Sequence, residues 1–139
     1  MIKELRDFFK SNILECDPSL KEWKDAFNID NIPESIIDNA FHIAIDDINT
    51  VEGDCSVTDQ VGVAVTLFKK GFRETQDAHD ALLDKAIAIR LSSLNVSKYN
   101  QTFIRNVESV TTTATDIESN DNLIIVTTNY VAYLTLNIS

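Results

Sequence analysis

Two histidines are the side chains best suited to acid–base chemistry in this chain. His42 alternates with apolar residues in a strand-like segment, and His79 lies beside Asp77 and Asp80 in a helical one. A histidine paired with a carboxylate can act as a general base, as in a hydrolase. Neither histidine has a serine or cysteine near it in a known nucleophile context. A packed or solvated histidine is the commoner arrangement, so we expect no catalytic residues and no enzyme activity.

A second chemical possibility is a calcium loop in the acidic segment that follows residue 45. An EF-hand loop needs oxygen ligands at alternate positions and a glycine at its sixth position. Here Val51 stands where an oxygen ligand belongs, and Gly53 comes one place late. The sequence therefore predicts a solvated acidic loop without a resident metal or cofactor, and weak cation binding is the alternative.

The charge of the chain is −10 overall and is distributed unevenly. Residues 31–60 contain seven acidic residues and neither lysine nor arginine, whereas the segment near residue 70 is basic. Excess negative charge disfavours nucleic-acid binding, because phosphate affinity comes from lysine and arginine. Separate patches of opposite charge suit head-to-tail contact between copies. The residues that we interpret as subunit or partner contacts are Asp46, Asp47, Glu52, Asp54, Asp59, Lys69, Lys70 and Arg73.

The size and composition fit a single domain over residues 1–139. A chain of 139 residues with 44% hydrophobic residues can bury one core without disulfides or metals. Cys16 and Cys55 lie far apart and lack metal-ligand spacing, so we expect two free thiols. The N-terminus is charged and no apolar run is long enough to span a bilayer, so we expect an intracellular protein without a membrane contact.

The N-terminal region is expected to form two helices. Apolar residues three and four apart predict a helix over residues 3–14. Asp17-Pro18 is a favourable helix start, because aspartate is a good N-cap and proline suits the first helical position. A short second helix would then bury Leu20, Trp23 and Phe27, and residues 28–34 would form a loop.

The remainder of the chain is expected to supply four strands and one helix. The expected strands are Ala40–Asp46, Val61–Phe68, Phe103–Ala114 and Leu123–Ile138, and the expected helix is Thr75–Leu94. Residues 47–59 would form a long acidic loop. Strands that follow one another without a helix favour antiparallel pairing. The chain therefore predicts an α+β fold, with one mainly antiparallel four-stranded sheet and both main helices on one face.

Two of these elements carry more apolar surface than one sheet contact requires. The helix Thr75–Leu94 has apolar residues around more than one narrow stripe, and the last strand is apolar on one face and half apolar on the other. Such elements are covered on a second side, by helices or by a neighbouring subunit. This surplus favours a protein that contacts other chains.

The order of elements resembles that of the tail-terminator proteins of long-tailed phages, the family that caps lambda-type tails. The matching segments are Ile2–Leu14, Phe41–Asp46, Val61–Phe68, Thr75–Leu94 and the aromatic-containing last strand around Tyr130. The likeness is one of pattern, without a diagnostic motif. Residues 15–39 form an insertion relative to a minimal member of that family.

The resemblance implies a structural virion protein that is assembled in the host cytoplasm and has no catalytic residues. Its copies would form a hexameric ring on the finished tail tube and offer their other side to the head-completion or connector protein. The implied partners are other copies and the tail-tube protein, and DNA would pass through the lumen without specific binding. A neck or tail-completion protein of similar fold is an alternative. A small acidic protein-binding module of a cellular system is another.

Overall fold

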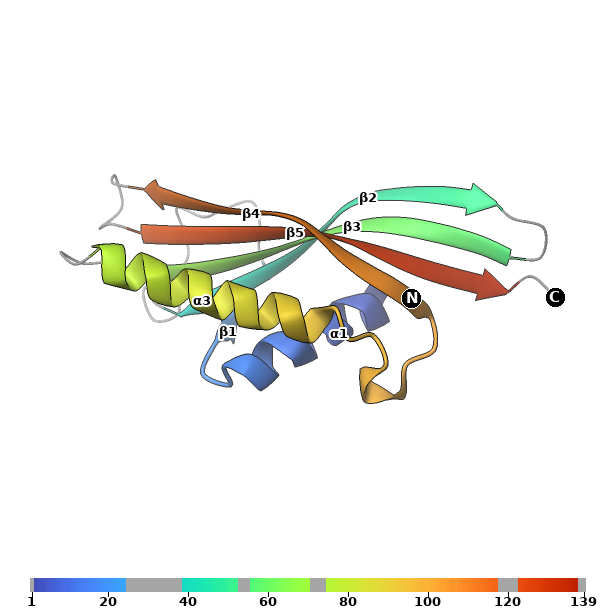
Figure 1. Cartoon of the computed structure of the whole chain (residues 1–139), viewed down its shortest axis with the longest axis horizontal. Coiled ribbons are helices and arrows are strands. Elements are labelled where there is room, and N and C mark those ends of the chain that lie inside the picture. Colours follow the sequence, from blue (N-terminus) through green and yellow to red (C-terminus); the bar gives the residue numbers. More distant parts are fainter. Residues whose placement is uncertain (1, 25–38, 53–55, 71–74, 118–122, 138–139) are drawn as a thin grey trace.

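The computed structural model describes residues 2–24, 39–52, 56–70, 75–117 and 123–137. These residues form a five-stranded sheet with two helices packed on one of its faces (Figure 1). The helices are α1 (Ile2–Cys16) and α3 (Thr75–Ser93), and a 3-10 turn, η2 (Lys98–Asn100), follows α3. The strands are β1 (Lys21–Glu22), β2 (Ala40–Glu52), β3 (Ser56–Lys70), β4 (Ile104–Ile117) and β5 (Leu123–Asn137).

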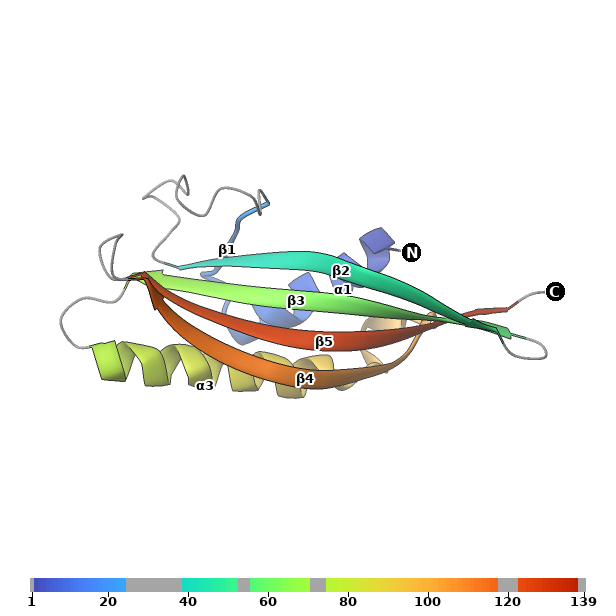
Figure 2. The ribbon, with the colours of Figure 1, turned by 90° about the horizontal axis from the view of Figure 1, so that it is seen from above.

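The strands lie in the order β1-β2-β3-β5-β4. β2, β3, β5 and β4 pair antiparallel, and β3 and β5 join the two strand pairs at the centre of the sheet. Both helices lie behind the sheet when it is viewed from above (Figure 2). The predicted α+β class, the antiparallel pairs and the helices on one face are therefore confirmed. The predicted number of strands is wrong, because β1 adds a fifth strand, parallel to β2.

The short helix predicted to begin at Asp17-Pro18 is absent from residues 17–24. The Asp17 carboxylate accepts hydrogen bonds from Ser19 N (3.0 Å) and Ser19 Oγ (2.5 Å), which closes a turn. The chain then extends: Lys21 N donates to Asn39 O at 3.0 Å, and Trp23 N donates to Phe41 O at 2.7 Å. These donors bind β2, so a helix-start signal produced a turn and a short strand. The rest of the predicted helix lies outside the described residues.

The predicted acidic loop at residues 47–59 is largely strand. β2 continues to Glu52 and β3 begins at Ser56, so the strands are much longer than predicted. The alternation is interrupted by a β-bulge between Ile45 and Ile48, which shifts the register of β2 against β3. Because a bulge reverses the face on which later side chains lie, a period of two cannot be followed through it.

The core lies between the sheet and the two helices. The predicted stripe of α1 is buried there, with Leu5, Phe9 and Ile13 at 0% exposure. The ring of Phe9 packs 5.1 Å, centroid to centroid, from that of Tyr130 on β5. The odd-numbered residues Val61 to Leu67 of β3 face the same layer, as their alternation predicted. Hydrophobic spacing thus placed both the helix stripe and the strand face correctly.

A buried polar network joins α1 to the end of α3. Asn12 is fully buried; its Nδ2 donates to Phe8 O at 2.9 Å, and its Oδ1 accepts from Ser92 Oγ at 2.8 Å. Around it, Tyr99 OH donates to Glu15 Oε2 at 2.6 Å. Tyr99 has a φ of 62°, an unfavourable value for a non-glycine residue. The network therefore fixes both the helix pair and a left-handed residue just after it.

Candidate binding surfaces

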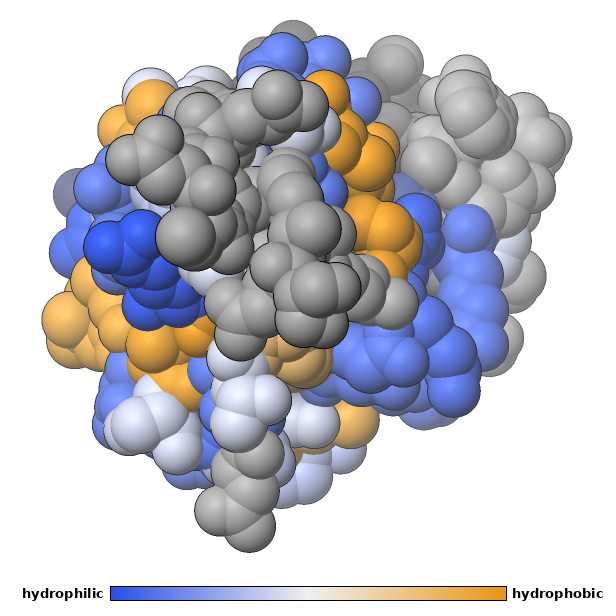
Figure 3. All heavy atoms as spheres, turned by 90° about the vertical axis from the view of Figure 1, so that its right-hand side faces the viewer, coloured by the Kyte–Doolittle hydropathy of each residue, from blue (hydrophilic) through white to orange (hydrophobic). Residues whose placement is uncertain are grey.

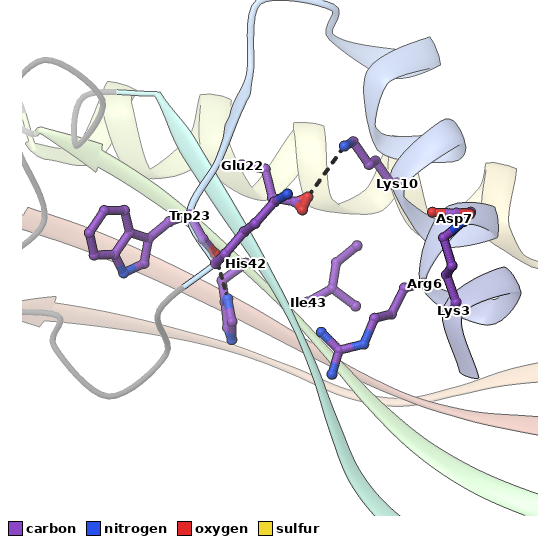
Figure 4. Close-up of a pocket in the computed structure, with 9 residues that line it drawn as sticks. Lys3, Arg6, Asp7, Lys10, Glu22, Trp23, His42 and Ile43 are labelled. Atoms are coloured by element: carbon purple, nitrogen blue, oxygen red, sulfur yellow. Dashed lines mark hydrogen bonds and ion pairs between the residues drawn. The ribbon is translucent and has the colours of Figure 1, made fainter.

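A basic groove lies between α1 and the β1–β2 edge of the sheet (Figure 4). Its volume is about 270 Å³. Four cationic and two acidic side chains line it, so it is locally positive in a protein of charge −10. The lining residues are Lys3, Arg6, Asp7, Lys10, Glu22, Trp23, Lys24, His42 and Ile43.

Sequence reasoning missed this groove. Lys3, Arg6 and Lys10 are spaced by three and four residues, which places them along one side of α1. That spacing was visible in the sequence. Their juxtaposition with Trp23 and His42 was not, because it depends on β1 pairing with β2.

The contacts inside the groove describe a binding surface. Lys10 Nζ lies 3.5 Å from Glu22 Oε2, close enough for an ion pair but without hydrogen-bond geometry. Figure 4 shows these two side chains reaching toward each other across the groove. His42 Nδ1 is 2.6 Å from Trp23 O, and since a carbonyl only accepts, Nδ1 is the donor. His42 Nε2 and Trp23 Nε1 are buried without a hydrogen-bond partner. The groove therefore offers cationic side chains to a ligand, whereas these two ring nitrogens are buried.

The structure describes the surroundings of the two histidines considered for acid–base chemistry. His42 is oriented by a backbone carbonyl, whereas a general base of the hydrolase type is oriented by a carboxylate. No serine or cysteine is among the residues that line the groove. His79 is half-buried on α3 and does not line it. The structure therefore does not bring the two histidines together.

The charged residues predicted as contacts fall into two separate groups along the β2–β3 hairpin. Asp46 and Asp47 are exposed at the β-bulge, and Asp59 accepts a hydrogen bond from Thr50 Oγ1 at 2.8 Å. Lys69 is half-buried, ten residues further along β3 than Asp59, or roughly 33 Å for an extended strand.

Four more residues from that prediction have no described side chain. Glu52 and Lys70 lie within β2 and β3, but only their backbone is described, and Asp54 and Arg73 lie outside the described residues. The structure thus separates an acidic end of the sheet from an end that contains Lys69. Contact between these ends in neighbouring copies stays a prediction.

The β2–β3 hairpin extends beyond the layer of helices at its acidic end (Figure 1). Ile48 has the parity of the core-facing Val61, with which it pairs, yet it is 54% exposed because the helices end short of it. Viewed from this end, apolar atoms are visible in separate patches between hydrophilic ones (Figure 3). The hairpin is therefore an arm with acidic and apolar side chains.

α3 and Leu94, the residue that follows it, present a long outward stripe, which we call the α3 stripe. Its members are spaced alternately by three and four residues and are all exposed. They are Asp77, Asp80, Asp84, Ile87, Leu91 and Leu94. The exposed fractions of Ile87, Leu91 and Leu94 are 43%, 62% and 38%. The apolar surplus predicted for this helix thus lies on its outward side, and its acidic half comes first.

Two sheet edges are open within the described part of the chain. β1 pairs with β2 only opposite Ala40 and Phe41, and β4 is the outermost strand on the other side. Each edge strand carries one exposed large apolar residue, Ile48 on β2 and Val110, at 62% exposure, on β4. An unpaired edge presents a row of backbone donors and acceptors to which another chain can add.

Two of the strongly perturbed ionisable groups lie where the turn after α1 contacts α3 and where η2 contacts α1. Burial raises the pKa of Asp17, but the Lys85 ammonium, 2.6 Å from its carboxylate, and the Ser19 hydrogen bonds outweigh this and hold the pKa at about 2. Burial and the hydrogen bond to Glu15 raise the pKa of Tyr99 to about 12. Cys16 is a free thiol whose pKa is raised, first by burial, and Cys55 lies outside the described residues.

The comparisons with known proteins leave the site to be judged on its geometry. No model of a protein family matches the chain, and no curated protein matches its sequence. In the described residues, no helix is long and apolar enough to cross a membrane. The same part of the chain has no group of three or more histidine, cysteine, aspartate or glutamate residues placed to hold a metal ion.

Proposed function

We propose that the protein is a structural assembly subunit that binds further copies of itself. The carrying observation is where its exposed large apolar residues lie. Among the residues whose burial is described there are six, and five of them lie on the two open sheet edges or on the α3 stripe, namely Ile48, Val110, Ile87, Leu91 and Leu94. The sixth, Tyr99, is engaged by Glu15. Ile87, Leu91 and Leu94 are grouped along one stripe, and a group of exposed apolar residues marks a contact surface. The open edges add unpaired backbone donors and acceptors to which another chain can bind.

The particular assembly that we propose is the tail-terminator ring of a long-tailed phage. The α+β order of two strand pairs around a long helix supports this role. The position of the open edges supports it further, because edges on opposite sides of one subunit suit a head-to-tail ring. In this proposal the copies form a hexamer on the tail tube, contact the head-side connector and let DNA pass through an acidic lumen.

Analytical ultracentrifugation together with electron microscopy tests the assembly. We expect concentration-dependent association and ring-shaped particles. A stable small dimer at all concentrations would favour the cellular binding module instead. A strictly monomeric protein at about 1 mM would contradict an assembly subunit that binds itself.

The virion role is tested separately in a phage from which the gene is deleted. We expect overlong or headless tails, because nothing would stop polymerisation of the tube. Normal virions would reject the tail-terminator role while leaving self-association intact.

A further inference from the structure

The basic groove and the acidic half of the α3 stripe match in charge and in spacing. Lys3, Arg6 and Lys10 follow one another by three and four residues along α1. Asp77, Asp80 and Asp84 follow one another by the same steps along α3, and all three are exposed. Two helices laid side by side can therefore place three cations against three carboxylates.

The two sets cannot meet within one molecule. The basic residues line a groove toward the β1–β2 edge, whereas α1 meets α3 on its other side, through Asn12 and Ser92. The acidic residues lie on the exposed side of α3, away from its buried residues Leu82, Ala86 and Ile89. The basic residues that line the groove therefore do not reach the acidic residues of the same molecule's α3.

We infer that the basic groove of one copy binds the α3 stripe of the next, an inference that rests on the proposed self-assembly. Like-with-like contact between two α3 helices is disfavoured, because a parallel pair opposes aspartates and an antiparallel pair buries aspartates against leucines. When the groove of one copy binds the stripe of another, the first copy still has a free stripe and the second a free groove. Further copies can therefore bind at both ends, which produces a ring or a filament.

The groove has features that suit a helix better than a small anion. Trp23 and Ile43 supply apolar surface beside the cations, which fits a stripe that is acidic at one end and apolar at the other. Leu91 is 62% exposed, and burying it against the groove of the next copy would stabilise the contact through the hydrophobic effect.

Charge reversal on each side provides the test. The basic-side variant is Lys3→Glu with Arg6→Glu, and the acidic-side variant is Asp80→Lys with Asp84→Lys. In each, two attractions become repulsions, so we expect the dissociation constant for self-association to rise about tenfold or more. Circular dichroism checks that both variants keep the wild-type melting temperature to within a few degrees, since all four residues are exposed.

Mixing the two variants gives the decisive readout. Each then offers the other a complementary surface, so sedimentation of an equimolar mixture should recover assemblies that neither variant forms alone. The matched control is Asp46→Lys with Asp47→Lys, which makes the same charge change at the bulge and should leave this contact intact.

Several outcomes would overturn the inference. Assemblies that persist in both reversed variants would show that the contact lies elsewhere while leaving self-assembly standing. Loss of association without recovery in the mixture would show that groove and stripe do not meet each other. Loss in the control alone would assign the contact to the acidic arm of the β2–β3 hairpin.

Discussion

At the scale of single residues, Asn12 determines how the two helices are joined. Its amide is fully buried and bonded on both sides, to Phe8 O within α1 and to Ser92 Oγ on α3. A buried polar group is tolerated only when it is hydrogen-bonded, and the partners left behind after its removal lose their bonds as well.

Replacing Asn12 by alanine should therefore lower the free energy of unfolding by about 1–3 kcal/mol. Urea denaturation followed by circular dichroism measures this. Ser11→Ala, at the neighbouring exposed position, is the control and should change stability by less than about 0.5 kcal/mol. Equal effects of the two substitutions would show that the network does not hold the helices together.

The pair of Asp17 and Lys85 makes part of the stability depend on pH. Because the pKa of Asp17 is lowered on folding, to about 2, its stabilising effect is complete above the ordinary aspartate pKa and is lost as pH falls toward 2. Asp17→Asn should cost about 1 kcal/mol at pH 7, and the difference from wild type should shrink between about pH 5 and pH 2.

Urea titrations at several pH values in that range measure the loss. The exposed Asp46→Asn serves as the control, with an expected effect below about 0.5 kcal/mol at pH 7. A pH-independent effect of Asp17→Asn would show that the turn through Ser19 matters and that the charge does not.

At the scale of elements, the β-bulge in β2 packs closely against Gly62 in β3. A β-carbon at Gly62 would lie 3.4 Å from Asp47 N and 3.6 Å from Asp46 Cβ, which is ordinary contact. Gly62 has no positive φ, so its backbone suits any residue. Space, rather than backbone conformation, is what limits substitution there.

We accordingly expect Gly62→Ala to be neutral or to stabilise by up to about 0.5 kcal/mol, through a less flexible unfolded chain. Gly62→Val should destabilise by about 1–3 kcal/mol, because its extra methyl groups must displace the bulge. Thermal unfolding of the two variants compares them directly. If valine were tolerated as well as alanine, the close approach would have no structural importance.

Several elements could be predicted from the sequence and others could not. Leu5, Phe9 and Ile13 revealed α1 because a regular helix keeps its period over its whole length. The helix predicted to start at Asp17-Pro18 was wrong, because an aspartate side chain accepts hydrogen bonds from the backbone in turns as well as at helix starts. The outer part of the β2–β3 hairpin was not predicted, because the bulge interrupts the two-residue period from which strands are recognised.

The candidate site was partly within reach of the sequence. Charge clustering singled out Asp46 and Asp47, which are exposed, and their role as contacts stays a prediction. The groove was out of reach, because its two walls are distant in sequence and come together only through β1. The α3 stripe was recognisable as surplus apolar residues, but which side of the helix they occupy depended on the packing of α3 against the sheet.

At the scale of the whole molecule, we expect the two sides of α3 to serve different properties, the buried side the stability of the fold and the α3 stripe the binding of other copies. Leu91 is 62% exposed, whereas Leu82 on the same helix is 2% exposed. Leu91→Glu should leave the free energy of unfolding within about 0.5 kcal/mol of wild type and weaken self-association about tenfold. Leu82→Ala, by contrast, should destabilise the fold by about 2–5 kcal/mol. Urea denaturation and sedimentation measure the two effects. A Leu91→Glu protein that assembles normally would remove the stripe from the interface.

The two carboxylates at the β2 bulge also restrict which strands can pair with the open edge of β2. Asp46 and Asp47 are both exposed beside an unpaired stretch of backbone. A passing unfolded chain that tried to lengthen the sheet there would have to bury two negative charges beside a kink. We therefore expect these two charges to protect the open edge of the sheet from fibril growth.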